Sequence, residues 1–81
     1  MTRAVIKLKQ DLSDALPVIA GAVESSAYND ITHVVSFRYH DLGVIVYPRE
    51  IIALGADSEN KAIEVIDFLK SIIGSNQHQK K

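Results

Sequence analysis

Residues 44–54 read VIVYPREIIAL, two short apolar runs on either side of Pro48. Aliphatic, β-branched and aromatic residues of this kind are enriched in strands, whereas proline cannot lie inside a central strand. The stretch therefore predicts two strands, Val44–Tyr47 and Ile51–Leu54, joined by a turn.

Both strands have apolar side chains on both of their sides. Val44 and Val46 would face one way, and Ile45 and Tyr47 would face the other, because successive side chains of a strand alternate. The strand 51–54 repeats this pattern. Runs that are apolar on both sides indicate strands covered on both faces of their sheet.

Two further strands are expected on either side of this pair. Residues Arg3–Lys9 alternate between polar and apolar types, which is typical of a half-buried strand. The segment Thr32–His40 is rich in β-branched and aromatic residues. Gly43 is expected to adopt the left-handed conformation that closes the following hairpin, and Tyr28–Asp30 is expected to be a loop.

Apolar residues spaced three and four apart predict a helix between the first two strands. Its N-cap is expected to be Asp11 or Ser13. Pro17 indicates that regular hydrogen bonding begins late, because its missing N–H is harmless only in the first turn. The pattern fades around residues 24–26.

A second helix is expected after the last strand. Asp57 or Ser58 would cap it, and Gly74 would end it in the left-handed conformation common after a helix. We therefore expect one domain over residues 1–74 and a flexible polar tail over residues 75–81.

This order of elements, β-α-β-β-β-α, predicts an α+β fold: a two-layer sandwich of a mainly antiparallel four-stranded sheet with both helices on one face. Two helices can cover only one face, so a second apolar face should stay exposed. Exposed patches of this kind usually mark a binding site. We assign six residues to binding on this open face: Lys7, Lys9, Val34, Arg38, Val46 and Tyr47.

Composition limits the classes of function. The chain has 81 residues, a formal net charge of −1 and no cysteine, which excludes disulfides, thiolate zinc sites and a cysteine nucleophile. No stretch approaches the roughly 20 apolar residues of a membrane span, and no signal peptide is expected, so we expect a cytoplasmic protein without a membrane partner.

A single core of this size stabilises a monomer by only about 3–5 kcal/mol. Because no disulfide or thiolate metal site can add stability, association of two or more copies is the most available way to stabilise the fold. Two-fold dimers are the commonest assembly, so a homodimer is expected.

No catalytic residue, metal site or cofactor is predicted. His33 and His40 would point to opposite faces of one strand, so they cannot chelate one ion unaided. Arg38, Tyr39, His40 and Asp41 form the densest polar cluster, and His40 with Asp41 is the candidate polar site if the chain acts on a small ligand.

The segment from Gly43 to Ile73 resembles the second part of one repeat of the TATA-box-binding protein. The shared features are an apolar strand ending in an aromatic (Val44–Tyr47), a turn with a basic residue (Arg49) and a strand ending in glycine before an amphipathic helix. The N-terminal domain of ribonuclease HIII, a single such repeat, is also similar. That repeat has five strands, whereas four are expected in this chain.

The resemblance implies that nucleic acid would lie on the open sheet face. In that family, side chains inserted between base steps kink the duplex. Tyr47 would take that position, and Lys7, Lys9 and Arg38 would form the neighbouring basic edge.

Three hypotheses follow. The first is a non-enzymatic interaction module that binds itself or another protein through the open face. The second, less favoured because the net charge is −1, is a nucleic-acid-binding domain. The third is a ligand-sensing subunit or enzyme acting near Arg38–Asp41.

Overall fold

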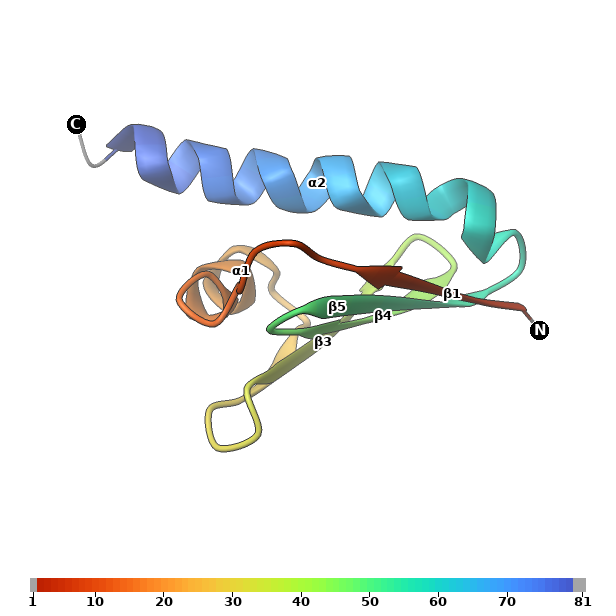
Figure 1. Cartoon of the computed structure of the whole chain (residues 1–81), viewed down its shortest axis with the longest axis horizontal. Coiled ribbons are helices and arrows are strands. Elements are labelled where there is room, and N and C mark those ends of the chain that lie inside the picture. The colour runs from red at the N-terminus through yellow and green to blue at the C-terminus, as the bar shows by residue number, and fades with distance from the viewer. Residues whose placement is uncertain (1, 80–81) are drawn as a thin grey trace.

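One antiparallel sheet of five strands, in the order β1-β5-β4-β3-β2, is accompanied by two helices (Figure 1). The computed structural model describes residues 2–79. The elements follow in the order β1 (Thr2–Lys7), α1 (Leu16–Ala22), β2 (Ala27–Asn29), β3 (Val34–Tyr39), β4 (Leu42–Tyr47), β5 (Glu50–Gly55) and α2 (Ser58–Gln79). The expected α+β class is confirmed, but the sheet has five strands rather than four.

The additional strand is β2, which lies where a loop was expected. Ala27 pairs with Ser36 and Asn29 with Val34, so β2 forms one edge of the sheet. Its three residues are all exposed. A strand this short, with no buried side, produces no alternation that a sequence pattern could reveal.

The hairpin between β3 and β4 is closed by His40 and Asp41, because Tyr39 pairs directly with Leu42. His40 has a φ of 54°, so it adopts the left-handed conformation. The expectation that Gly43 would do so is wrong: Gly43 pairs with Arg38 inside the ladder. The turn at Pro48 is confirmed.

Helix α1 begins later than its expected caps. Its N-cap is Ala15, with no side-chain capping bond, so the assignment of Asp11 or Ser13 is wrong. Instead the Leu12 carbonyl accepts the N–H groups of Ala15 and Leu16 in a preceding turn. The late start expected from Pro17 is confirmed.

Helix α2 begins at Ser58, as expected, but continues through Gly74 to Gln79. The expectation that Gly74 ends the helix is therefore wrong. A glycine inside a helix costs only about 0.5–1 kcal/mol relative to alanine, and this does not terminate a helix by itself. Of the expected tail, residues 75–79 continue α2, and residues 80–81 lie outside the described part of the chain.

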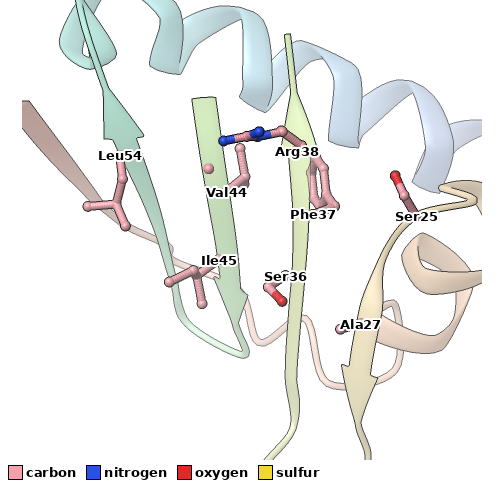
Figure 2. A pocket seen from close by; sticks show the side chains of 9 residues that line it. Ser25, Ala27, Ser36, Phe37, Arg38, Val44, Ile45 and Leu54 are labelled. Atoms are coloured by element: carbon pink, nitrogen blue, oxygen red, sulfur yellow. The ribbon is translucent and has the colours of Figure 1, made fainter. Parts of the chain in front are cut away.

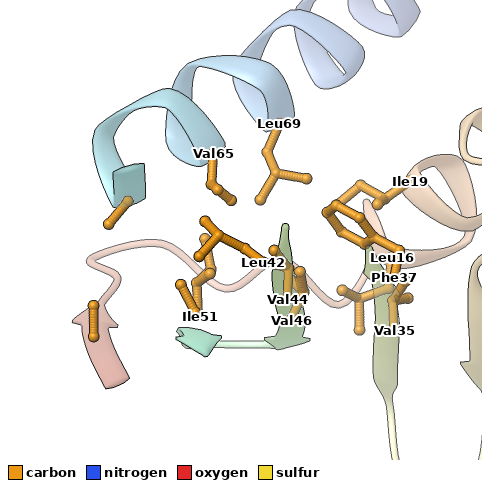
Figure 3. Packing of buried hydrophobic residues seen from close by; sticks show 13 residues of the cluster. Leu16, Ile19, Val35, Phe37, Leu42, Val44, Val46, Ile51, Val65 and Leu69 are labelled. Atoms are coloured by element: carbon orange, nitrogen blue, oxygen red, sulfur yellow. The ribbon is translucent and has the colours of Figure 1, made fainter. Parts of the chain in front are cut away.

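The core lies between one face of the sheet and the two helices (Figure 3). Leu16 and Ile19 of α1 and Val65 and Leu69 of α2 point to the same side of the strands. Buried strand residues complete this core: Ala4, Val35, Phe37, Leu42, Val44, Val46, Ile51 and Ala53. Every second residue of β4 is buried, which confirms the alternation predicted for that strand.

Within residues 2–79, neither helix has the length and apolar character needed to cross a membrane.

Candidate functional site

The sheet face away from the core is apolar along its middle. Val5, Ile52 and Ile45 are paired in register across β1, β5 and β4, so they form one transverse row. The row continues through Ser36 to Ala27. Val5 is 45% exposed. A contiguous row of partly exposed aliphatic side chains is a candidate contact surface, whereas aliphatic residues exposed singly are ordinary.

Two further rows flank this apolar row. At one end Arg38, Gly43, Leu54 and Arg3 are cross-strand neighbours. At the other end Tyr47, Glu50 and Lys7 are paired. We call this surface the open face; it comprises Arg3, Val5, Lys7, Ala27, Asn29, Val34, Ser36, Arg38, Gly43, Ile45, Tyr47, Glu50, Ile52 and Leu54.

The charges of the open face are mostly positive. Glu50 is its only carboxylate and pairs with Lys7 at 2.6 Å, Oε1 to Nζ. The Lys7 side chain is 81% exposed, so this pair stabilises the fold by no more than about 1 kcal/mol. Within the described residues Arg3 and Arg38 have no acidic partner, which leaves the opposite end of the face cationic.

A hollow of about 320 Å³ lies at this cationic end, over Gly43 (Figure 2). A Cβ at Gly43 would meet no atom within 4 Å, so the missing side chain leaves open space between its neighbours. Figure 2 shows the Arg38 side chain extending from β3 across β4. Ser36, Ile45 and Leu54 line the same hollow. The arrangement can receive a small side chain of a partner, but it contains no pair of groups suited to proton transfer.

The structure brings four of the six assigned binding residues to the open face: Lys7, Val34, Arg38 and Tyr47. The assignment of Val46 is wrong, because its side chain is 0% exposed and belongs to the core. Val46 and Tyr47 are neighbours in one strand and must point to opposite faces. Lys9 lies past the end of β1, where it lines a groove near α2.

The residues that carry the open face were absent from that assignment. Val5, Ile45 and Ile52 form its centre, and Arg3 supplies a second unpaired cation. The alternation of side chains along each strand places Arg3, Val5, Ile45 and Ile52 on the side away from the core. The missing signal was the register, which shows that the three aliphatic residues are adjacent.

The polar cluster of residues 38–41 does not converge on one point. Arg38 belongs to the open face, whereas the Tyr39 ring packs against Phe68 of α2 at 5.0 Å. The His40 ring meets the Tyr39 ring edge-on at 4.5 Å. No hydrogen bond joins the side chains of His40 and Asp41, and no metal-binding cluster forms, in the described part of the chain. The position of this cluster adds no support to the enzyme hypothesis.

Among the described residues, the carboxyl group of Asp11 has a shifted pKa. The Ser13 hydroxyl and backbone N–H, the latter 2.7 Å from Asp11 Oδ1, hold the pKa of Asp11 below its ordinary value. Asp11 lies in the loop between β1 and α1, so this shift belongs to a turn and not to the open face.

The chain matches no protein-family model, no curated protein and no solved structure. Its function must therefore be inferred from the open face itself.

Proposed function

We propose that this domain is a non-enzymatic interaction module that binds a second copy of itself through the open face. The observation that carries the proposal is the in-register row of Val5, Ile52 and Ile45. In this proposal the sheet and the two helices of one copy form a two-layer sandwich. The sheet of the second copy covers the apolar row. Burying that row stabilises the dimer by about 25 cal/mol for each Å² of apolar surface that is removed from water.

The size of the sheet sets the expected strength of the dimer. Strands lie about 4.8 Å apart and rise about 3.3 Å per residue, so five strands of up to six residues span roughly 24 Å by 20 Å. A face of this size is small for a protein interface, because standard interfaces bury about 800 Å² of accessible surface on each partner. We therefore expect a weak, reversible dimer.

The charges favour one orientation of the two copies. Arg3 and Arg38 lie at one end of the open face, and the ion pair of Glu50 with Lys7 leaves the other end close to neutral. A two-fold axis perpendicular to the strands would place the arginine end of one copy over the Glu50 end of its partner. A two-fold axis parallel to the strands would instead bring the arginines of both copies together. Like charges in contact disfavour association.

The test is the oligomeric state of a surface variant. Ile45→Lys puts a charge in the centre of the apolar row, where it would be buried without a partner, so the dimer should dissociate. Ile63→Lys is the matched control, because Ile63 lies on α2 and is 67% exposed. Sedimentation equilibrium over a range of concentrations should show dimers for the wild type and Ile63→Lys, and monomers for Ile45→Lys.

A wild-type chain that stays monomeric at its highest soluble concentration would contradict the proposal. So would an Ile45→Lys variant that dimerises as well as the wild type.

A second candidate is a nucleic-acid-binding domain of the TATA-box-binding-protein type. It is supported by the fifth strand, which gives the sheet the strand count of that repeat, and by the position of Tyr47 on the same face as Arg3 and Arg38, at the opposite end of the strands. Two unpaired arginines would contact few phosphates, so the logarithm of the duplex binding constant should fall with the logarithm of salt concentration with a slope of about −2.

Arg38→Glu should abolish such binding, whereas Lys61→Glu on α2 should preserve it. Binding that is absent or independent of salt would remove this candidate.

A further inference from the structure

A second concave surface lies on the helix side of the sheet, separate from the hollow over Gly43. It is a groove of about 630 Å³ between α2, β1 and the chain that follows β1. Its lining includes Lys7, Leu8, Lys9 and Leu12 from β1 and the segment after it, and Lys70 and Ile73 from α2.

The groove exists because α2 is longer than the sheet beneath it. At 1.5 Å per residue its 22 residues span about 33 Å, whereas a six-residue strand spans about 20 Å. Figure 1 shows the C-terminal end of α2 extending past the strands. Ile73 therefore lies toward the end of the apolar stripe of α2, where it is only half-buried.

The opposite wall of the groove is held by backbone hydrogen bonds. The N–H of Leu8 donates to the carbonyl of Arg49 at 2.9 Å, and the N–H of Leu12 donates to the carbonyl of Pro48 at 2.6 Å. These bonds tie the segment after β1 to the turn between β4 and β5. The side chains of Leu8 and Leu12 remain half-buried against the core.

The chemistry of the groove combines an apolar interior with a positive rim. Three lysines, Lys7, Lys9 and Lys70, are among its described lining residues, and no carboxylate is. Lys7 is engaged by Glu50, but Lys9 and Lys70 form no ion pair with any described residue. A ligand that fits both features has an aliphatic chain and one negative charge.

We propose that this groove binds a free medium-chain aliphatic carboxylate. The chain would lie among Leu8, Leu12 and Ile73, and the carboxylate would meet Lys9 and Lys70 at the rim. The volume falls within the range of about 300–1,000 Å³ typical of small-molecule sites. Apart from Lys7, the described lining residues of the groove do not belong to the open face, so this ligand site goes beyond the self-association proposed there.

Titration with decanoate, kept below its micelle concentration and followed by NMR, tests the proposal. The largest chemical-shift changes should map to Leu8, Leu12 and Ile73. Affinity should rise from octanoate to decanoate by up to about fourfold per added methylene, because each methylene leaves water. Decyltrimethylammonium, which has the same chain and the opposite charge, should bind at least tenfold more weakly.

Charge reversal at the rim provides the matched variants. Lys9→Glu combined with Lys70→Glu should weaken decanoate binding at least tenfold. Lys61→Glu on the same helix is the control and should leave binding unchanged; it lies near the helix N-terminus, where a negative charge is favourable.

The proposal would be overturned by no binding, by equal binding of the cationic amphiphile, by binding unaffected by the double substitution, or by shift changes confined to Ile45 and Ile52. The monomer expected of Ile45→Lys separates this proposal from the previous one, because that variant should still bind decanoate. Loss of decanoate binding in Ile45→Lys would move the ligand to the open face and thus also contradict the groove.

Discussion

At the scale of single residues, three side chains occupy a backbone conformation that disfavours them. His33, His40 and Asp57 have φ values of 57°, 54° and 60°. The left-handed conformation costs an L-residue roughly 1–2 kcal/mol. Each of the three lies in a turn, and no glycine of the chain occupies these positions.

His33 offers the simplest test of this cost. It is exposed and follows a turn in which Asn29 Oδ1 accepts the N–H groups of Ile31 and Thr32 at 2.9 and 3.0 Å. Glycine adopts a positive φ without steric cost. His33→Gly should therefore raise the free energy of unfolding by about 1 kcal/mol in urea denaturation, net of the added chain entropy.

Thr32→Gly is the control for that substitution. Its φ is not positive, so glycine relieves no strain there and should lower stability. Equal effects of the two substitutions would show that the turn at His33 carries no strain.

At the scale of the elements, the end of β5 depends on a close backbone approach. Gly55 has a φ of 141°, and a Cβ there would lie 3.1 Å from Leu42 Cδ2 and 3.2 Å from the Asp41 carbonyl oxygen. A side chain at this position would require the Leu42 side chain and the Asp41 backbone to shift by a few tenths of an ångström, in addition to the strain of a positive φ. The glycine that ends β5 thus allows the chain to pass from the sheet to α2.

Gly55→Ala should destabilise the domain by about 2 kcal/mol, because it adds both backbone strain and a steric conflict. Gly43→Ala is the matched control in the adjacent strand, where a Cβ meets open space. It should be neutral or stabilising by up to about 1 kcal/mol. Thermal unfolding followed by circular dichroism compares the two. A Gly55→Ala variant as stable as Gly43→Ala would contradict this account.

The strands with strong patterns could be predicted from the sequence, and the weakly patterned parts could not. The apolar, β-branched content of residues 44–54 and the proline between the two runs identified β4 and β5, and the opposite directions of successive side chains indicated that both of their sides are apolar. β2 was not predictable, because its three residues are all exposed and give no alternation, although it pairs with β3 in a local hairpin. The end of α2 was misplaced because Gly74 is tolerated within a helix.

For the candidate site, alternation could exclude Val46 from the open face but could not reveal which residues are adjacent. Adjacency depends on register, which joins Val5 to Ile52 and Ile52 to Ile45 across strands distant in sequence. Lys9 was misjudged for a related reason. The alternating pattern of the first strand continues in the sequence after β1 has ended at Lys7.

At the scale of the whole molecule, stability and self-association should be coupled. A single core of this size leaves little margin, so a dimer that binds only the folded chain raises apparent stability by mass action. The melting temperature of the wild type should therefore increase with protein concentration.

Scanning calorimetry at several concentrations measures this coupling. Ile45→Lys should melt at a temperature independent of concentration, whereas Ile63→Lys should retain the dependence. A wild-type melting temperature that does not change with concentration would argue against a dimer stabilised through the open face.

The pairing of β1 with β5 has a consequence for how the fold is completed. The first strand of the chain binds the last one, from Thr2 against Gly55 to Lys7 against Glu50, and it has no other neighbour in the sheet. The remaining strands β2 to β5 form a continuous meander without it. A synthetic peptide of the first nine residues should consequently reconstitute the native sheet when it is mixed with the remainder of the chain. Recovery of native structure when the two pieces are mixed would show that β1 can add to the sheet without a covalent link to the other strands.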